Sequence, residues 1–373
     1  MPSTHLRQTR LTQAKHVVVK IGTQLLIDKS GKLDQPYIQH IADQIADLAQ
    51  RKIQITLVSS GAIGAGLAEL ALPKRPKDVA KLQAIAAVGQ RKLMMGFHDA
   101  FEQHDMEVAQ LLLTRSDLDD RLRYLNFRNC IAQTHRYGCV PIINENDSVA
   151  VDEIRFGDND MLAALACNAL RADAMIILSG VDGLLDDKSQ RVDLLEHAKS
   201  GLKYARDEKS ALGTGGISSK LQAAQLVADS GEVSVIANGR IQNVIVKILT
   251  GEKEIGTVFV PAEKKLDSRS RFIGQTTRPA GKITVDDGAA NALVNKGKSL
   301  LATGITEVTG RFDRGQVIEI INTQGTALAR GLSNYSDGEL QLIKGKRSNQ
   351  FGKLLGRQAF DEVIHRDNLV VLK

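Results

Sequence analysis

Two segments of the chain combine a lysine with glycines and hydroxyls, as phosphate-binding loops do. Residues 213–220, GTGGISSK, hold three glycines, three hydroxyl side chains and Lys220, and they open an apolar helix. Backbone N–H groups at a helix N-terminus bind anions, and the lysine ammonium acts on the same charge. In residues 17–23, VVVKIGT, Lys20 ends a strand-like run and Gly22 forms the turn after it. Burying a lysine there is costly unless an anion meets it or its ammonium reaches water.

A third glycine cluster, SSGAIGAG at residues 59–66, also follows a strand-like run and opens a helix. Its spacing differs from the G-x-G-x-x-G of dinucleotide folds, and it lacks the Gly-Lys-Ser/Thr of a Walker A loop. Its amides and hydroxyls favour an anion such as a carboxylate or a phosphate. The alternative is a tight turn that uses glycine for clearance.

Acids and amides gather after another strand-like run, in residues 143–149 (INENDSV) and 157–160 (GDND). They are the groups that an amino-acid ligand needs for its ammonium and carboxylate, although Asx-turns and a helix N-cap explain some of them. The eight histidines form no H-x-x-H, H-x-x-x-H or H-E-x-x-H pair, and no Gly-x-Ser-x-Gly elbow occurs. Zinc hydrolases and serine hydrolases are therefore not indicated.

These groups suit the transfer of a phosphoryl group to a carboxylate. A glutamate-type carboxyl has a pKa of about 4.3, so it is ionised at neutral pH and needs no general base. Catalysis then consists of positioning and of neutralising charge on the phosphoryl group. Lysines, glycine-loop amides and Mg²⁺ do this in phosphoryl-transfer enzymes.

Composition places the chain among ordinary globular proteins. It has 373 residues, 43% hydrophobic and 25% charged, with a net charge of +6, which excludes a disordered or collagen-like chain. No apolar run approaches the roughly 18 residues that span a bilayer, and the polar N-terminus lacks a signal-peptide pattern. We therefore expect a cytoplasmic protein with no membrane partner. The three cysteines show no C-x-x-C spacing and are expected to be reduced core thiols.

The elements that must position these groups alternate along the first two thirds of the chain. Strands are predicted at residues 16–21, 53–58, 140–143, 174–178 and 233–237, and helices at 36–50, 76–104, 121–137, 159–170 and 218–229. This alternation predicts a parallel sheet with helices on both faces, in which ligands bind beyond the carboxyl ends of the strands. After a polar stretch, short runs separated by glycine turns, at 282–285, 299–301, 317–321 and 326–329, predict a mainly β domain.

The motifs VVVKIGT, SSGAIGAG, INENDSV, GDND and GTGGISSK, in this order, resemble the amino-acid kinase family, and residues 281–357 resemble a PUA domain. The resemblance implies a three-layer α/β/α fold with a mainly parallel sheet, plus a small C-terminal mainly β domain. The expected divisions are a catalytic domain (13–261), a linker (262–278), a PUA-like domain (279–357) and a tail packing on it (358–373). Within the family, the similarity is to members that phosphorylate the side-chain carboxylate of L-glutamate with ATP and Mg²⁺. They make L-glutamyl 5-phosphate, the first step of proline biosynthesis.

The resemblance also implies a role for each matching residue. Lys20, Lys220 and Asp160 are the expected catalytic residues, and glutamate is expected to contact Ser60, Asn144, Asp147 and Asn159. Nucleotide or phosphate binding is expected of both lysines and of Gly22, Gly61, Ser179, Gly180, Thr214, Gly215, Gly216, Ile217, Ser218 and Ser219. The protein supplies no direct metal ligand in this scheme, because Mg²⁺ is held mainly through the ATP phosphates. Gly180 and Leu185 depart from the family, which has an acidic and an aromatic residue there, and this leaves the nucleotide preference open.

Alternatives and partners complete the expectations. A kinase of aspartate or N-acetylglutamate is a second possibility, although an acetylated amine does not favour the acidic 144–147 cluster. An RNA-binding or RNA-modifying protein is a third possibility. The basic excess of the C-terminal domain is mild and aromatic residues make up only 4% of the chain, so RNA is not expected. The family resemblance implies feedback inhibition by proline, hand-over of the product to glutamyl-phosphate reductase, and a homo-oligomer, dimer or tetramer, in which helix 78–98 could form the interface.

Overall fold

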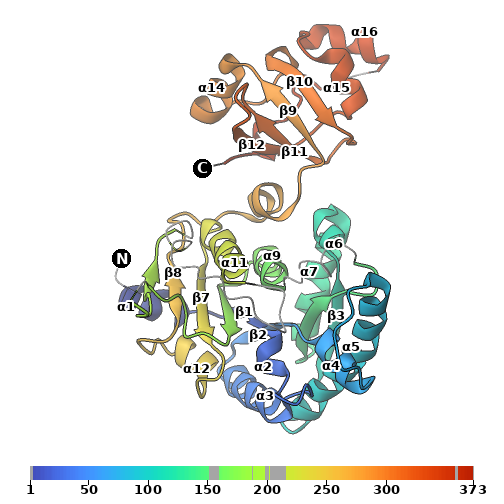
Figure 1. Cartoon of the computed structure of the whole chain (residues 1–373). Coiled ribbons are helices and arrows are strands. Elements are labelled where there is room, and N and C mark those ends of the chain that lie inside the picture. Colours follow the sequence, from blue (N-terminus) through green and yellow to red (C-terminus); the bar gives the residue numbers. More distant parts are fainter. Residues whose placement is uncertain are drawn as a thin grey trace. The chain divides into compact units, whose positions relative to one another are not determined.

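The computed structural model describes residues 3–150, 159–186, 188–197, 201, 216–357 and 360–372. The chain divides into two compact units, Met1–Lys265 and Leu266–Lys373 (Figure 1). Within the described ranges, no helix has the length and apolar character needed to cross a membrane. Each unit has its own sheet and its own apolar core.

An eight-stranded sheet with the order β3-β4-β2-β1-β5-β7-β8-β6 forms the centre of the first unit. Neighbouring strands run parallel except for the antiparallel pair β7 and β8. The strands are β1 (His16–Ile21), β2 (Gln54–Ser59), β3 (Val108–Leu113), β4 (Val140–Glu145), β5 (Ala174–Ser179), β6 (Leu194–Leu195), β7 (Val233–Asn238) and β8 (Thr257–Phe259). All six residues of β5 are buried, as expected for a parallel strand covered on both faces.

Helices cover both faces of this sheet and make three layers (Figure 1). One face packs on α3 (Gln35–Gln50), α5 (Val79–Glu102) and α12 (Val244–Leu249), which share a core with alternate strand residues such as Val17 and Val19. The other face carries α7 (Arg121–Arg136), α9 (Asn159–Leu170) and α11 (Ile217–Asp229). Because side chains alternate along a strand, Lys20 of β1 points to the face that α9 covers. The predicted three-layer fold is thus confirmed.

Side-chain caps explain where the predicted helices begin. Asp34 accepts a hydrogen bond from Tyr37 N at 3.1 Å at the start of α3, and Asp78 accepts one from Lys81 N at 2.9 Å at the start of α5. These contacts satisfy N–H groups that a helix leaves unpaired. The helix predicted from residue 76 therefore begins at Val79, and the other four predicted helices agree with the structure to within a residue or two.

The sequence patterns missed three strands of this sheet: β3, β6 and β8. β3 lies at the sheet edge and is only partly buried, so its residues lack the continuous burial of the central strands. β6 and β8 span only two and three residues, too few for a period to be recognised. The cysteine prediction was wrong in part: Cys130, Cys139 and Cys167 form no disulfide, but Cys130 is exposed and lies outside the core.

The second unit is built on a five-stranded sheet with the order β10-β9-β11-β12-β13. Its strands are β9 (Gly281–Val285), β10 (Ile305–Gly310), β11 (Val317–Ile321), β12 (Ala327–Leu332) and β13 (Leu369–Val371), and its longer helices are α14 (Asp287–Lys296), α15 (Asp337–Ile343) and α16 (Phe351–Leu355). The strand predicted at 299–301 is wrong, since only an isolated bridge between Leu300 and Ile364 forms there. Leu300 is buried as a single anchoring residue, which a short apolar run cannot distinguish from a strand.

Much of the stretch expected to be an exposed linker, residues 262–278, is folded in the structure. It contains the short helix α13 (Ser268–Arg271) and a π-helical turn, Phe272–Thr276. Phe272 and Ile273 are buried, and Arg330 of β12 donates a hydrogen bond to Gly274 O at 3.1 Å. The stretch from residue 266 onward therefore belongs to the second unit.

Candidate active site

The carboxyl ends of four adjacent parallel strands bring the chemical groups of the sequence motifs together. In the register of the sheet, Lys20 of β1 lies beside Val58 of β2 and Ile177 of β5. Val58 in turn lies beside Ile143 of β4. The residues that follow these positions, Ser60, Asn144 and Ser179, therefore come to the same edge of the sheet. Open parallel sheets bind ligands at this edge.

Asp160 holds two lysines that come from distant parts of the chain. Lys20 Nζ lies 2.5 Å from Asp160 Oδ1, and Lys220 Nζ lies 2.9 Å from Asp160 Oδ2. Asp160 is fully buried in the first turn of α9, and both lysine side chains are largely buried. The structure therefore assembles Lys20, Asp160 and Lys220 into one cluster, as the motifs implied.

The electrostatics of the cluster keep Asp160 ionised. Burial by itself would raise the pKa of its carboxyl, but the two ammonium groups outweigh this and lower that pKa to about 2. The carboxylate therefore stays charged at neutral pH and sets the position of both ammonium groups. Two positive charges held beside one negative charge form a site suited to a further anion, such as a phosphoryl group.

The N-terminus of α11 delivers Lys220 to this cluster. Gly216 is the N-cap, and Ser219 Oγ lies 3.0 Å from Gly216 O and 3.3 Å from Asp160 Oδ2. Ile217 and Ser218 complete the first turn, whose N–H groups are available to an anion. Thr214 and Gly215, which the motif also implicates, lie outside the described residues.

An amide cluster lies in the same region and joins the ends of β2 and β4 to α9. Asn159 Nδ2 lies 2.9 Å from Ser59 O, 3.0 Å from Ser60 Oγ and 2.9 Å from Asn144 Oδ1. Asn144 and Asn159 are both buried. Because Asn159 directly precedes Asp160, the start of α9 connects the amide cluster to the lysine cluster.

Two of the predicted glycines have a structural role, Gly61 through its backbone conformation and Gly22 through the space beside Lys20. Gly61 is the N-cap of α4 (Ala62–Glu69) and has a φ of 101°, a conformation that favours glycine. Gly22 begins α2 (Thr23–Leu26), and a Cβ on it would lie 3.9 Å from Lys20 Nζ. A larger residue at 22 would therefore fill space beside the ammonium group, where an anion has to approach.

The segment after β5, where a nucleotide was expected, contains an unsatisfied hydroxyl. Ser179 is buried, and its Oγ has no hydrogen-bond partner within the part of the chain that is described. Gly180 is exposed, and a Cβ on it would lie 3.1 Å from Gln24 Oε1. Leu185 is also exposed. The sequence analysis missed Asp182 and Asn238, which join the ends of β5 and β7 by a 2.8 Å hydrogen bond. The acid–amide pair after two strand-like runs was the available signal.

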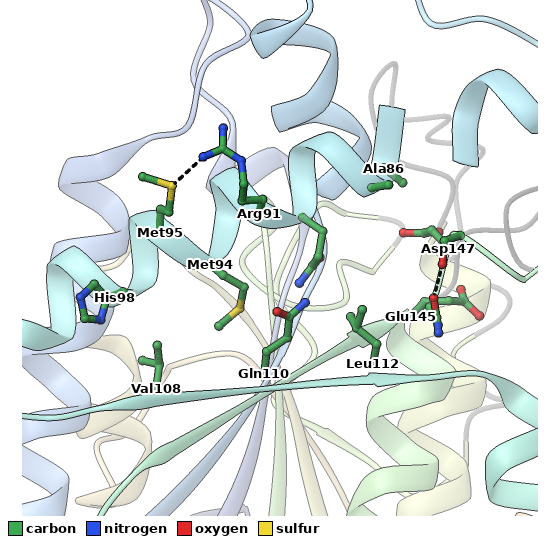
Figure 2. A pocket seen from close by; sticks show the side chains of 14 residues that line it. Ala86, Arg91, Met94, Met95, His98, Val108, Gln110, Leu112, Glu145 and Asp147 are labelled. Atoms are coloured by element: carbon green, nitrogen blue, oxygen red, sulfur yellow. Dashed lines mark hydrogen bonds between the residues drawn. The ribbon is translucent and has the colours of Figure 1, made fainter. Parts of the chain in front are cut away.

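Asp147 lies in the lining of a cavity of about 620 Å³ (Figure 2). α5 and the edge strand β3 form the walls, with Met94 and Gln110 projecting into the space between them, and Glu145 and Asp147 lie at one end. Gln90 of α5 also lines this cavity. Its Oε1 accepts a hydrogen bond from Asn144 Nδ2 at 2.7 Å. No motif included Gln90, because it is one glutamine within a long helix.

Two protein-family models match parts of the chain. The model of the amino acid kinase family matches residues 15–238, and the PUA domain model matches residues 281–355. The chain is 43% identical over 364 residues to the glutamate 5-kinase of Caldanaerobacter subterraneus subsp. tengcongensis, with 96% of this chain and 98% of that protein covered. It is 40% identical over 374 residues to the glutamate 5-kinase of Geobacter sp. (strain M21), covering 98% and 100%.

Among solved structures, a carbamate kinase from Giardia lamblia bound to AMP-PNP is 16% identical, with a TM-score of 0.49, covering 67% of this chain and 100% of that one. The family assignment rests instead on the family model, which spans more than half of the chain, and on relatives aligned over nearly all of it. This chain is a kinase that belongs to the amino acid kinase family and carries a C-terminal PUA domain.

Proposed function

We propose that the protein transfers the γ-phosphoryl group of ATP to the side-chain carboxylate of L-glutamate, giving L-glutamyl 5-phosphate, the first step of proline biosynthesis. The observation that supports this most directly is the pair of buried lysines on Asp160, next to the amide cluster of Asn144 and Asn159. The first group neutralises a phosphoryl group, and the second offers donors and acceptors to an amino acid. Relatives named glutamate 5-kinase support the same choice.

In this proposal Lys20 and Lys220 stabilise the negative charge on the phosphoryl group while it moves from the leaving oxygen of ADP to the carboxylate oxygen of glutamate. Asp160 keeps both ammonium groups in place and has no proton to give, because its pKa is about 2. The glutamate carboxylate is ionised at neutral pH and attacks without a general base. The work of the protein is then positioning and charge neutralisation, which is where most catalysis of phosphoryl transfer arises.

We assign glutamate to the edge formed by Ser60, Asn144 and Asn159, with Asp147 as the acidic partner of its ammonium group. Asn and Ser side chains both donate and accept, so they can bind either end of an amino acid. An acetylated amine carries no positive charge and gains nothing from Asp147. This difference favours glutamate over N-acetylglutamate.

The nucleotide is assigned to the ends of β5 and α11. The buried hydroxyl of Ser179, which has no hydrogen-bond partner among the described residues, fits a phosphate chain with its nucleoside. The exposed Gly180 and the glycine-rich start of α11 fit it as well. The predicted contacts Thr214 and Gly215 belong to this assignment as well. Mg²⁺, held mainly through the phosphates of ATP, would spread their negative charge. The two lysines fit that arrangement, because they add positive charge where phosphates meet the acceptor.

The test is to incubate the full chain with ATP, Mg²⁺ and L-glutamate in hydroxylamine, which traps an acyl phosphate as a coloured hydroxamate. Aspartate and N-acetylglutamate serve as parallel substrates. Colour with glutamate alone is expected. Colour with aspartate or N-acetylglutamate instead would overturn the substrate, and no colour with any of the three would overturn the reaction.

Four further assignments belong to the same proposal. The catalytic domain is residues 13–261 and the PUA-like domain residues 279–357, with the C-terminal tail, residues 358–373, packed on the PUA-like domain.

Proline inhibits the reaction through the loop after β4, which a proline titration of the hydroxamate assay tests. The labile acyl phosphate passes to a glutamyl-phosphate reductase in the cytoplasm, where ATP and glutamate are available. The protein works as a homo-oligomer, a dimer or tetramer, with part of α5 in the interface, and its mass in solution tests this.

A further inference from the structure

Gln90 is held in a fixed position by a close contact between two helices. A Cβ on Gly89 would lie 1.8 Å from Ala62 O, and one on Gly66 would lie 2.0 Å from Ile85 O. The backbones of α4 and α5 therefore touch, and neither helix can slide along the other without a clash. Gln90 follows this contact directly and is 8% exposed. Its side chain consequently projects from a rigid point of the fold.

The hydrogen bonds around Asn144 determine which way its amide faces. Two N–H groups converge on Asn144 Oδ1, from Asn159 Nδ2 at 2.9 Å and from Glu145 N at 2.8 Å. Oxygen has to occupy that position, because an NH₂ group there would meet two other donors. The Nδ2 group of Asn144 is thereby turned toward Gln90, where only an acceptor can satisfy it.

Gln90 supplies that acceptor and leaves its own donor without a bond. Gln90 Oε1 accepts from Asn144 Nδ2 at 2.7 Å, and Gln90 Nε2 is buried with no hydrogen-bond partner among the residues the structure covers. A buried unsatisfied NH₂ group costs free energy. Rotating the Gln90 amide would place two NH₂ groups face to face, so the side chain keeps its oxygen on Asn144. The orientation of the Gln90 amide is therefore the one that gives Asn144 Nδ2 an acceptor.

We propose that Gln90 is a positioning residue of the glutamate subsite, which fixes the amide of Asn144 and through it the hydrogen bond to Asn159. The inference rests on the proposed function, because it assigns to glutamate the site that Asn144 helps to form. Without Gln90, Asn144 Nδ2 is buried with no acceptor on α5, and its amide turns away from Asn159. Glutamate then binds more weakly, whereas the lysines on Asp160 keep their geometry.

The first experiment compares Gln90→Leu, which removes the acceptor, with Gln90→Glu, which keeps an oxygen in the same place. Gln90→Leu is expected to raise the KM for glutamate about tenfold or more, the usual cost of one hydrogen bond in a buried site. Its kcat and its KM for ATP stay within about threefold of the wild type, since the lost bond acts on substrate binding alone. Gln90→Glu is expected to keep the KM for glutamate within about threefold.

Two controls separate positioning from general damage. Gln110→Leu makes the same substitution in the wall of the same cavity and is expected to leave every kinetic constant within about twofold of the wild type. If Gln90→Leu lowers the thermal midpoint by several degrees, Gln90→Met takes its place, because methionine keeps the length and shape and lacks the acceptor. A structural role alone would not produce a change confined to the KM for glutamate.

A double-mutant cycle then tests whether Gln90 acts through Asn144. In an Asn144→Ala background, Gln90→Leu is expected to cause no further rise in the KM for glutamate. The same rise in both backgrounds would overturn the proposal, as would an unchanged KM for Gln90→Leu or an equal rise for Gln90→Glu. A wild-type protein that forms no hydroxamate with glutamate would overturn the proposed function and this inference with it. The wild-type assay therefore distinguishes the two failures.

Discussion

Each unit of the protein contains a carboxylate held between two cations, and the two arrangements differ in ways that matter for function. In the first unit Asp160 is fully buried and contacts the ammonium groups of Lys20 and Lys220. In the second unit Glu339 of α15 is paired with the guanidinium groups of Arg314 and Arg357, the latter at 2.8 Å. The cations lower the pKa of each carboxyl to about 2, against the opposite effect of burial.

The cations and their surroundings differ. Glu339 is committed to the fold: it accepts from Ser336 N at 3.0 Å in a capping box, and Arg357 stacks over the ring of Tyr335. Planar guanidinium groups match the geometry of a carboxylate, so few of their N–H groups remain to bind another anion. Lysine ammonium groups are compact and can face a second anion while they keep the first. Similar charges therefore build a structural clamp in one unit and the proposed phosphoryl site in the other.

The largest expected effect comes from removing one of the lysines. Lys220→Ala is expected to lower kcat in the hydroxamate assay by roughly 10³-fold, the size found when a donor to a developing charge is lost. Circular dichroism should show an intact fold. As the matched variant in the other unit, Arg357→Ala should stay within about twofold of the wild-type kcat. Wild-type turnover for Lys220→Ala would refute the role of that lysine.

Neutralising the shared carboxylate is the next largest change. Asp160→Asn is expected to lower kcat by about 10²-fold, because two ammonium groups held beside a neutral amide repel each other and lose their common anchor. Glu339→Gln is the control, and its kcat should not change by more than about twofold. Similar kcat losses in both variants would mean that the two clamps do not differ in function.

A smaller effect is expected on stability. Glu339→Gln should lower the free energy of unfolding by about 2 kcal/mol, the contribution of hydrogen bonds to a charged group. Differential scanning calorimetry of the full chain should show a lower midpoint for one transition. An unchanged calorimetric profile would contradict a structural role for this cluster.

The stabilisation by Glu339 should also depend on pH. Because the folded pKa of about 2 lies below the ordinary value of about 4.3, the contribution is fully present above that ordinary value and is lost as pH falls toward 2. The difference in midpoint between wild type and Glu339→Gln should therefore be constant from pH 7 to 5 and shrink below pH 4. A difference that grows on acidification would have the wrong sign.

The smallest effect is expected at the nucleotide segment. Gly180→Ala should change the KM for ATP by less than about threefold, because the nearest atom to the new Cβ is Oε1 of Gln24, the end of a flexible exposed side chain. Gly61→Ala is the comparison variant. The backbone at Gly61 has a φ of 101°, so any side chain there is strained by about 1 kcal/mol. A larger kinetic effect at Gly180 than at Gly61 would show that position 180 contacts the nucleotide tightly.

Much of the site could be predicted because its residues occur in short motifs at the ends of recognisable elements. Lys20 ends an unbroken β-branched run, and Lys220 follows a glycine-rich loop at a helix start, so the type and the place of each were visible together. The central strands and the long helices could be predicted for the same reason. The edge strand β3, the folded segment after residue 265 and the role of Gln90 have no such local signal, because burial by distant residues produces each of them.

The sequence by itself determined the classes of group present, the strand–helix alternation and the presence of a second, mainly β unit, because periodicity and motif spacing are local properties. Only the tertiary structure decided that Lys20 and Lys220, 200 residues apart, meet on one carboxylate, and that a glutamine of α5 orients Asn144. Such contacts depend on which strands become neighbours and on where two helix backbones touch. Both are set by packing between segments distant in the sequence, which no local pattern records.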